Sequence, residues 1–462
     1  MKLITIATLG IFISTASAAK SADFFDGAGE DGKAVMQEAR ARIEKIRKGD
    51  FKVRLEGPDG SPLAGRADVQ LLRHEFQWGG LLMGAGFEAP ADSPSRVQAL
   101  KVVEELFSTA GVANSWKATQ PTRRGPMQWK MTDDMVAWAN ARGMDLRTHC
   151  LIYNFYPSIP AWYDTVKTTE EWWPLIENRI RTVAERYGNA IGEYNVINEM
   201  LMNRAWAAAN NPKFPRLSDP AVGARIFQIA RKYLPHATLV TLEAPYATMN
   251  ASNTFFKEVF DYDAALLKLG APVDVIGFQG HYFATGDMPF QVGNSKGGPG
   301  AFTMKSIGEG LDHLATLGKP IHITEFHPPS RSSKRDDPQP RLSPEETAAW
   351  AANYLTLVFS KPYIEQLIYY NIIDGTAGRA IDGGLVTKAG KLKLTYYAVR
   401  KLLKDEWNTH WQGEPAGGAI ALRGFFGRYV VQVDGYEPAT FWLRAKGERE
   451  IIVRLAPRKK AP

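Results

Sequence analysis

Two glutamates, each at the end of an apolar run, are the residues whose chemistry most needs an explanation. Glu199 closes the stretch "GEYNVINE", and Glu325 lies inside "IHITEFH". A carboxylate in such a place is costly to bury unless a partner or a reaction uses it. Cleavage of a glycosidic bond uses two carboxyl groups, one to protonate the leaving oxygen and one to attack or to activate water. We therefore interpret Glu199 as an acid/base and Glu325 as a nucleophile, with helix capping or ion pairing as the structural alternative.

Other polar and aromatic side chains follow similar apolar runs. Amides and charged groups bind sugar hydroxyls, and aromatic rings cover the apolar faces of sugars. The predicted substrate-binding residues are Asn114, Lys117, His149, Asn154, Trp162, Asn198, Gln279, Tyr282, His327 and Tyr370. We predict that His281 orients Glu325 through a hydrogen bond. For His281, Trp162 and Tyr370 the structural alternative is an ordinary place in the core. Glu243 could bind substrate or simply pair with a Lys or Arg.

The apolar runs that position these residues alternate with helical segments, which indicates a parallel sheet. The candidate strands are residues 81–87, 112–118, 145–153, 192–200, 237–245, 273–282, 321–327 and 365–373. Ser343, Pro344 and Glu346 form a capping box with a proline start, which predicts a helix between the last two strands. Eight such repeats predict a (β/α)8 TIM barrel, whose active site lies at the carboxyl ends of the strands. An open doubly wound sheet is the alternative, but the chain lacks a G-x-G-x-x-G loop after its first strand.

The two ends of the chain differ from the middle. Residues 19–49 contain apolar residues at helical spacing. Residues 50–78 and 406–462 alternate apolar with polar residues and contain glycine turns, as strands and hairpins do. A β unit as small as the N-terminal one is not stable alone. We predict that the two β units pair into one small β-sandwich-like module beside a barrel of residues 79–405.

Composition and the N-terminal segment indicate an exported globular protein. The 462 residues are 45% hydrophobic and 23% charged, with a formal net charge of +7. Residues 1–18 join one Lys to an apolar run and end in Ala16-Ser17-Ala18, the pattern of a cleavable signal peptide. We therefore predict a secreted or periplasmic protein. No later run is long enough for a membrane span.

Several partner classes have little support in the sequence. The mild positive charge comes without a long Lys/Arg run, so no nucleic acid is expected as a partner. The single cysteine, Cys150, lies in an apolar run, so we expect a buried and inert thiol. We expect a polysaccharide or oligosaccharide substrate, a monomer, no cofactor and no metal.

Taken in order, these motifs resemble those of glycoside hydrolase family 10, the retaining endo-β-1,4-xylanase family of the clan A barrels, from Trp78 to Leu403. The stretches "NSWK", "RTHCLIYN" and "IPAWY" are similar to N-x-M-K, R-G-H-T-L-V-W-H and L-P-x-W of that family, so Trp162 would be a cleft aromatic. The stretches "NVINE", "GFQGH" and "ITEF" are similar to D-V-V-N-E, G-x-Q-x-H and I-T-E-L-D. The closing segment "GGLVTKAGKLKLTYYAVRKLL" also resembles that of the family.

The resemblance implies a role for the matched residues. Glu199 would be the acid/base and Glu325 the nucleophile of a retaining reaction, with His281 orienting the nucleophile. Asn198 would bond the sugar 2-hydroxyl, and Gln279 would contact the substrate or the nucleophile.

Several positions depart from the family pattern. Tyr153 and Asn154 stand where the family has tryptophan and histidine, and His327 stands where it has aspartate. The family tryptophan expected after the Tyr370 segment is absent, and the usual N-D-Y is replaced around Glu243. These changes fall on the glycone side of the pocket. The resemblance therefore implies the reaction type and leaves open whether the sugar is xylan or a related glycan.

Two other function classes fit part of the pattern. A degenerate barrel could bind carbohydrate without cleaving it, although the joint presence of both glutamates and their amides argues against that reading. A metal-dependent hydrolase would use His149, His281 and His327 with carboxylates. The chain has no H-x-H or H-E-x-x-H spacing that would support such a site.

Overall fold

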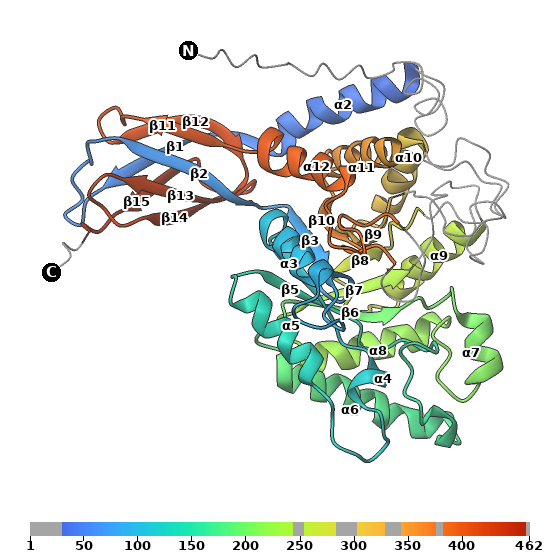
Figure 1. The fold of residues 1–462 in the computed structure, drawn as a ribbon. Helices are drawn as coiled ribbons and strands as arrows, with labels where there is room; N and C mark the ends of the chain where they lie inside the picture. Colours follow the sequence, from blue (N-terminus) through green and yellow to red (C-terminus); the bar gives the residue numbers. More distant parts are fainter. Residues whose placement is uncertain (1–29, 244–253, 283–302, 329–342, 376–381, 459–462) are drawn as a thin grey trace, which may run out of the picture.

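The computed structural model describes residues 30–243, 254–282, 303–328, 343–375 and 382–458. The predicted signal peptide, residues 1–18, lies outside the described residues. The described chain forms a barrel, a smaller module of two β-sheets beside it, and an N-terminal helix that lies against the barrel (Figure 1).

Eight parallel strands close into the barrel, and neighbours in the barrel follow the order of the chain. The strands are β3 (Gln77–Leu81), β4 (Thr109–Ala113), β5 (Asp145–His149), β6 (Glu193–Asn198), β7 (Thr238–Glu243), β8 (Val275–Phe278), β9 (Ile321–Phe326) and β10 (Ile364–Tyr369). The barrel closes where β10 pairs with β3, with Leu367 opposite Trp78. Every residue of β4, β6, β8 and β9 is buried, as expected for strands covered on both faces. The predicted (β/α)8 barrel is therefore confirmed.

The first barrel strand lies earlier than the sequence pattern predicted. Residues 81–87 were predicted as the strand, but β3 ends at Leu81 and Met83–Ala85 form a 3-10 turn. The strand includes the glycine pair Gly79-Gly80, which adds no apolar side chain to the sequence pattern. A Cβ at Gly79 would lie 2.3 Å from Ile368 Cδ1 and 2.8 Å from the Thr109 carbonyl oxygen. Glycine is needed there because the neighbouring strands approach closely.

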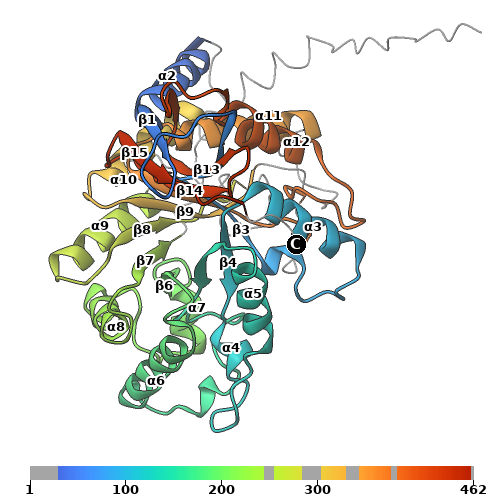
Figure 2. The same cartoon turned by 90° about the vertical axis from the view of Figure 1, so that its left-hand side faces the viewer.

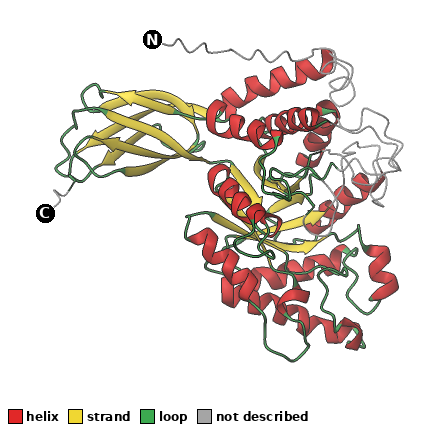
Figure 3. Ribbon diagram, in the orientation of Figure 1, coloured by secondary structure: helices red, strands yellow, loops and turns green. Residues whose placement is uncertain are grey.

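Helices surround the barrel, as Figure 3 shows. The long helices are α3 (Pro94–Leu106), α5 (Lys130–Asn140), α6 (Thr169–Tyr187), α8 (Pro220–Tyr233), α9 (Thr254–Lys268), α10 (Met304–Ala315) and α11 (Pro344–Phe359). The short helices are α4 (Trp116–Thr119), α7 (Arg204–Asn210) and α12 (Leu394–Arg400), the last continued by a π-helical turn at Lys401–Glu406.

The predicted capping box of α11 is present. The Ser343 Oγ accepts from the Glu346 backbone N–H at 3.2 Å, and the Ser343 N–H donates to Glu346 Oε2 at 2.7 Å. Together with Pro344 at the first helical position, these bonds satisfy backbone donors that the helix start would otherwise leave unpaired.

The two chain ends pair into the predicted β module. One sheet has the order β12-β1-β15 and the other β11-β2-β13-β14. The strands are β1 (Lys48–Glu56), β2 (Ala67–His74), β11 (His410–Gly413), β12 (Ala419–Phe425), β13 (Gly427–Val433), β14 (Ala439–Leu443) and β15 (Glu450–Arg454). Both N-terminal strands lie beside C-terminal ones: β1 is antiparallel to β12 and parallel to β15, and β2 is antiparallel to β11 and β13. Phe51, Val53 and Leu55 of β1 alternate into the space between the sheets.

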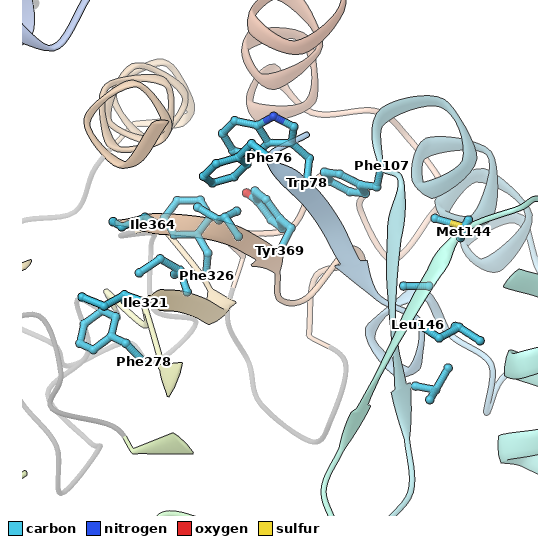
Figure 4. Close-up of a cluster of buried hydrophobic side chains, with 14 of the residues drawn as sticks. Phe76, Trp78, Phe107, Met144, Leu146, Phe278, Ile321, Phe326, Ile364 and Tyr369 are labelled. Carbon is cyan, nitrogen blue, oxygen red and sulfur yellow. The ribbon is translucent and has the colours of Figure 1, made fainter. Parts of the chain in front are cut away.

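The β module attaches at the amino-terminal end of the barrel strands, because β2 leads directly into β3. Figure 4 shows buried aromatic and aliphatic side chains here, including Phe76 and Trp78. The Trp78 ring stacks on Trp407 with centroids 5.5 Å apart. This packing leaves the opposite end of the barrel, where the strands finish, for the predicted site.

The N-terminal helix α2 (Glu30–Ile46) lies along α10 and α11 (Figure 2). At its end Arg47 donates hydrogen bonds to the carbonyl oxygens of Phe359, Lys361 and Ile364, at 2.7 to 2.8 Å. Arg47 thereby binds the carbonyls between α11 and β10. Among the helices of the described residues, none combines the length and apolar character needed to cross a membrane.

Candidate active site

Glu199 follows the last residue of β6 and has an unusual backbone. Its φ of 50° lies in the left-handed region, and it is the one non-glycine residue with positive φ among the described residues. Its N–H donates to the Leu242 carbonyl oxygen of β7 at 2.8 Å, so the strained turn is anchored to the neighbouring strand. Such a conformation costs on the order of 1–3 kcal/mol and occurs most often at functional sites.

Three donors hold the side-chain carboxylate of Glu199. The Tyr153 hydroxyl donates to Oε2 at 2.5 Å, and the Asn203 amide also donates to Oε2. The Gln279 amide donates to Oε1 at 3.0 Å. The donors come from the chain after β5, from the start of α7 and from the chain after β8. Tyr153 and Gln279, both distant in sequence, therefore each hold one oxygen of this carboxylate, and Asn203 adds a contact from four residues away.

Glu325 lies in β9 and is only 5% exposed. Its Oε2 is 3.1 Å from His281 Nε2, and its Oε1 is 3.4 Å from His149 Nδ1. The structure thus brings His281 to the carboxylate that it was predicted to orient. Burial lowers the pKa of His149 below its ordinary value, although the Glu325 carboxylate opposes that shift.

Gln279 joins the two glutamates. Its Nε2 lies 3.0 Å from Glu199 Oε1 and 3.4 Å from Glu325 Oε1. Because one nitrogen contacts both oxygens, these oxygens are at most about 6.4 Å apart, the sum of the two contacts. Glu199 and Glu325 therefore face one shared space at the carboxyl end of the barrel.

A second group of side chains supports His149. The Asn195 amide donates to Asn198 Oδ1 at 3.2 Å and lies 3.3 Å from His149 Nδ1. Asn195 was missed by the sequence reasoning, and so was Asn203. The available signal for Asn195 was a polar residue inside the apolar run of β6. Asn203 follows three apolar residues, Met200 to Met202, in the loop after β6, and no strand-end pattern marked it.

Four predicted substrate-binding residues are held by protein partners. The Asn114 side chain is fully buried and accepts from Arg179 of α6 at 3.1 Å. Asn154 is buried and accepts from Asn211 at 3.1 Å. Trp162 is buried, with its Nε1 donating to the Gln120 carbonyl oxygen at 2.9 Å. Exposed Lys117 donates to the Tyr156 carbonyl oxygen at 3.0 Å. The packing of Trp162 agrees with the alternative that it is an ordinary core residue.

Tyr282 and Asn114 are the predicted substrate-binding residues with no exposed surface. The Tyr282 ring is fully buried against Trp350 and Tyr354 of α11, at centroid distances of 4.8 and 5.0 Å. It therefore lies in the layer between barrel and helices, and its contact with a sugar remains a prediction. The same holds for Asn114, because its amide is buried against the Arg179 guanidinium. Both follow strands in sequence, and their side chains contact the surrounding helices α6 and α11.

Tyr370 and His327 lie beside His281. The Tyr370 ring meets the His281 ring edge-on with centroids 5.0 Å apart. His327 is buried and its backbone pairs with that of His281. The absence of a side chain at Gly383 makes room for His327, since a Cβ there would lie 2.2 Å from its Cε1. Their predicted sugar contacts remain predictions.

Glu243 ends β7 and is buried, and its Oε2 accepts from the Leu201 N–H at 2.7 Å. It thus fixes the loop that follows Glu199, an alternative role to the predicted substrate contact. Cys150 is also buried, and burial raises the pKa of its thiol. Within the described parts of the chain, no three His, Cys, Asp or Glu side chains are arranged to hold a metal ion.

Comparisons with known proteins place these features in a family. A family model described as glycosyl hydrolase family 10 matches residues 72–401. Endo-1,4-beta-xylanase 2 of Arabidopsis thaliana is 25% identical over 421 residues, which cover 87% of this chain and 34% of the relative. Endo-1,4-beta-xylanase C of Paenibacillus barcinonensis is 26% identical over 266 residues, 53% of this chain and 22% of the relative. The chain thus spans about a third of the length of the plant relative.

Solved structures resemble the barrel. Xylanase 10B from Thermotoga petrophila RKU-1, solved in complex with xylobiose, has a TM-score of 0.56 at 19% identity, covering 72% of this chain and 95% of that one. A structure from Paenibacillus barcinonensis has a TM-score of 0.54 at 20% identity, covering 72% and 96%. At these identities the likeness concerns the fold.

Proposed function

Because the chain belongs to glycosyl hydrolase family 10, we propose that it is a retaining glycoside hydrolase that cleaves β-linked polysaccharide or oligosaccharide. Glu199 is the acid/base and Glu325 the nucleophile. The observation that carries the proposal is the Gln279 amide shared by the two carboxylates, which limits their facing oxygens to about 6.4 Å. Carboxyl groups lie about 5–5.5 Å apart in retaining enzymes and about 6.5–9.5 Å apart in inverting ones.

In the first step Glu325 attacks the anomeric carbon. The bond from that carbon to the leaving oxygen breaks, and Glu199 transfers its proton to this oxygen. The product is a glycosyl ester on Glu325. His281 and His149 contact the two oxygens of Glu325 and limit its rotation, which favours one angle of attack.

In the second step Glu199 acts as a base. It takes a proton from a water molecule, whose oxygen attacks the anomeric carbon while the ester bond to Glu325 breaks. Two inversions give net retention. The three donors around Glu199 keep its carboxylate in one place for both steps.

For the substrate, we propose xylan or a related β-linked glycan. The curated relatives are named endo-1,4-beta-xylanases. Tyr153, Asn154 and His327 differ from the family pattern on the glycone side, where pocket lining sets specificity. The N-terminal sequence supports export as part of the same proposal, with a cleavable signal peptide ending near Ala18.

The first experiment measures product release from neutral xylans, mixed-linkage glucans and acidic polysaccharides, with wild type and Glu325→Ala side by side. We expect activity on at least one polymer, and a loss of about 10³-fold or more in the variant. NMR of the fresh product should show the β-anomer first. An α-anomer would exclude retention. If wild type releases no product from any polymer but binds one of them, a carbohydrate-binding protein is favoured.

A second variant separates the two roles. Glu199→Ala should retain the first step on an aryl glycoside whose activated leaving group needs no proton, and should then stall at the glycosyl ester. Added azide, which needs no general base, should restore turnover and give a β-glycosyl azide. A Glu199→Ala protein with wild-type turnover on an unactivated glycan would assign the acid/base to another residue.

A further inference from the structure

The two oxygens of Glu199 have different surroundings. Oε2 accepts from both Tyr153 and Asn203, whereas Oε1 accepts from Gln279 at 3.0 Å. The Asn203 amide nitrogen also lies 3.1 Å from the Tyr153 hydroxyl. Tyr153, Asn203 and Oε2 of Glu199 therefore form a closed triangle of polar contacts. Oε1 is the oxygen that shares Gln279 with Glu325 and faces the reaction space.

The Asn203 side chain contacts Glu199 and does not cap its own helix. It is the N-cap residue of α7, where an asparagine side chain normally accepts from a backbone N–H of the first turn. No such bond forms, and the buried amide is used on Glu199 instead. A local preference that is broken in this way is expected at a functional site.

Tyr153 is held by packing on its other side. Its ring lies 5.7 Å from that of Phe155, which in turn meets Trp206 of α7 edge-on at 5.3 Å. The same helix thus supports both donors. Tyr153 stands where the family pattern has a tryptophan, so this hydroxyl belongs to the departures of this chain from that pattern.

We propose that Tyr153 and Asn203 are positioning residues that keep Oε2 of Glu199 as a hydrogen-bond acceptor, so that Oε1 carries the exchanged proton. This inference rests on the proposed function. In the first step the proton leaves Oε1 for the leaving oxygen, and in the second step it passes from water to Oε1. No proton moves through Tyr153, which keeps its own throughout.

The inference predicts a change in the pH dependence of the reaction. Two donors to Oε2 stabilise a carboxylate by hydrogen bonding, so losing one donor should change the pH dependence of kcat/KM. The alkaline limb of the pH profile of kcat/KM should then move to higher pH. Among the described titratable groups, Tyr153 contacts Glu199, Cys150 interacts with it electrostatically, and Glu325 shares Gln279 with it. One step further away, His149 and His281 contact Glu325, and Glu243 accepts from the loop that follows Glu199.

The test compares Tyr153→Phe with Tyr156→Phe. Tyr156 lies three residues later and is 60% exposed, so its phenol serves as the matched control. For Tyr153→Phe we expect the alkaline limb to move up by about half to one pH unit. Turnover of an unactivated glycan should fall about tenfold, and turnover of an activated aryl glycoside should fall less. Tyr156→Phe should match wild type in all three measurements.

Asn203→Ala should shift the limb in the same direction as Tyr153→Phe. A limb that stays at the wild-type pH in both variants would overturn the inference, even if both lose activity through a general structural effect.

A direct titration separates this failure from failure of the proposed function. Carbon-13 NMR of protein labelled at glutamate, with the Glu199 signal assigned through Glu199→Gln, follows the same carboxyl group without substrate. If wild type hydrolyses no glycan but the Glu199 signal titrates at higher pH in Tyr153→Phe, the contact stands and the proposed function fails. If wild type is active and neither signal nor limb moves, the inference fails alone.

Discussion

The two ends of the barrel both bury a glutamate among histidines and amides, yet they differ in charge. At the amino-terminal end Glu193 meets Arg147 at 2.8 Å, His322 at 3.2 Å and the Gln366 amide at 2.7 Å. At the carboxyl end Glu325 meets His281, His149 and Gln279 among the described residues. In the described chain no Arg or Lys forms an ion pair with Glu199 or Glu325.

This difference separates a structural cluster from a reactive one. Arg147 is fully buried against Glu193, so this carboxylate is paired with a guanidinium cation. Burial by itself would raise the pKa of Glu193, but His322 and Arg147 outweigh it and lower that pKa to about 2. The glutamates at the mouth are held by neutral amides, a phenol and imidazoles, which orient a carboxyl group without fixing its charge.

The largest effect should follow from breaking the amino-terminal cluster. Glu193→Ala leaves Arg147 as a buried unpaired charge, so we expect the free energy of unfolding to fall by about 3–5 kcal/mol. Denaturant unfolding measures this, and kcat per folded molecule should stay within about twofold. Glu177→Ala is the control, because Glu177 pairs with Lys232 at the surface. This variant should show no measurable loss in the free energy of unfolding. Equal stability of Glu193→Ala and wild type would refute the structural role.

The pH dependence of stability should be the next largest effect. The folded pKa of Glu193, about 2, lies below the ordinary value of 4.5. The unfolded chain therefore binds this proton more readily, and the stabilisation is complete above pH 4.5 and lost as the pH falls towards 2. It amounts to roughly 3 kcal/mol.

Unfolding of wild type and Glu193→Gln at pH 7, 5 and 3 measures this dependence. The gap in unfolding free energy should shrink as the pH falls, and a gap that is constant from pH 7 to 3 would contradict the assignment. The neighbouring His322 acts with the opposite sign. Burial lowers its pKa, but Glu193 and Glu365 overcome this and raise it, so its stabilisation is lost as the pH rises through that raised value.

A smaller effect is expected from loosening the carboxyl-terminal cluster. His281→Ala removes the contact to Glu325 Oε2, and the less well held nucleophile should lower kcat by about 10- to 100-fold while KM changes little. His281→Gln, which can place an amide nitrogen near the same oxygen, should recover part of the loss. His313→Ala on α10 serves as a control at the outside of the barrel. A change in KM alone would show that His281 binds substrate instead.

Much of this architecture could be read from the sequence. Alternating apolar and helical runs predicted the barrel, because strands covered on both faces must be apolar throughout and the helices that cover them must be amphipathic. The alternation of residues 50–78 and 406–462 predicted the β module, since neither segment could bury one face alone. The glutamates Glu199 and Glu325 stood out because buried strands rarely end in a charge without a use for it.

Other features depended on side-chain direction, which the sequence does not reveal. Asn114 and Tyr282 follow strands just as Asn198 and Gln279 do, yet they turn towards α6 and α11. The positions of residues along a strand were predictable, but a turn after the strand can point a side chain to either side. The first strand was placed at residues 81–87 because its glycines gave no apolar signal, although glycine at Gly79 allows a close approach of strands.

The sequence by itself determined the order of strands and helices and the presence of two carboxylates at strand ends, because these depend on local periodicity and on the cost of burying charge. Only the tertiary structure decided which groups meet those carboxylates. Tyr153 and Gln279 come from other loops than Glu199, and their approach to it depends on barrel closure, whereas Asn203 lies four residues after Glu199 at the start of α7. Contacts between residues 46 and 80 positions apart, such as Tyr153–Glu199 and Gln279–Glu199, carry no periodic signal in the chain.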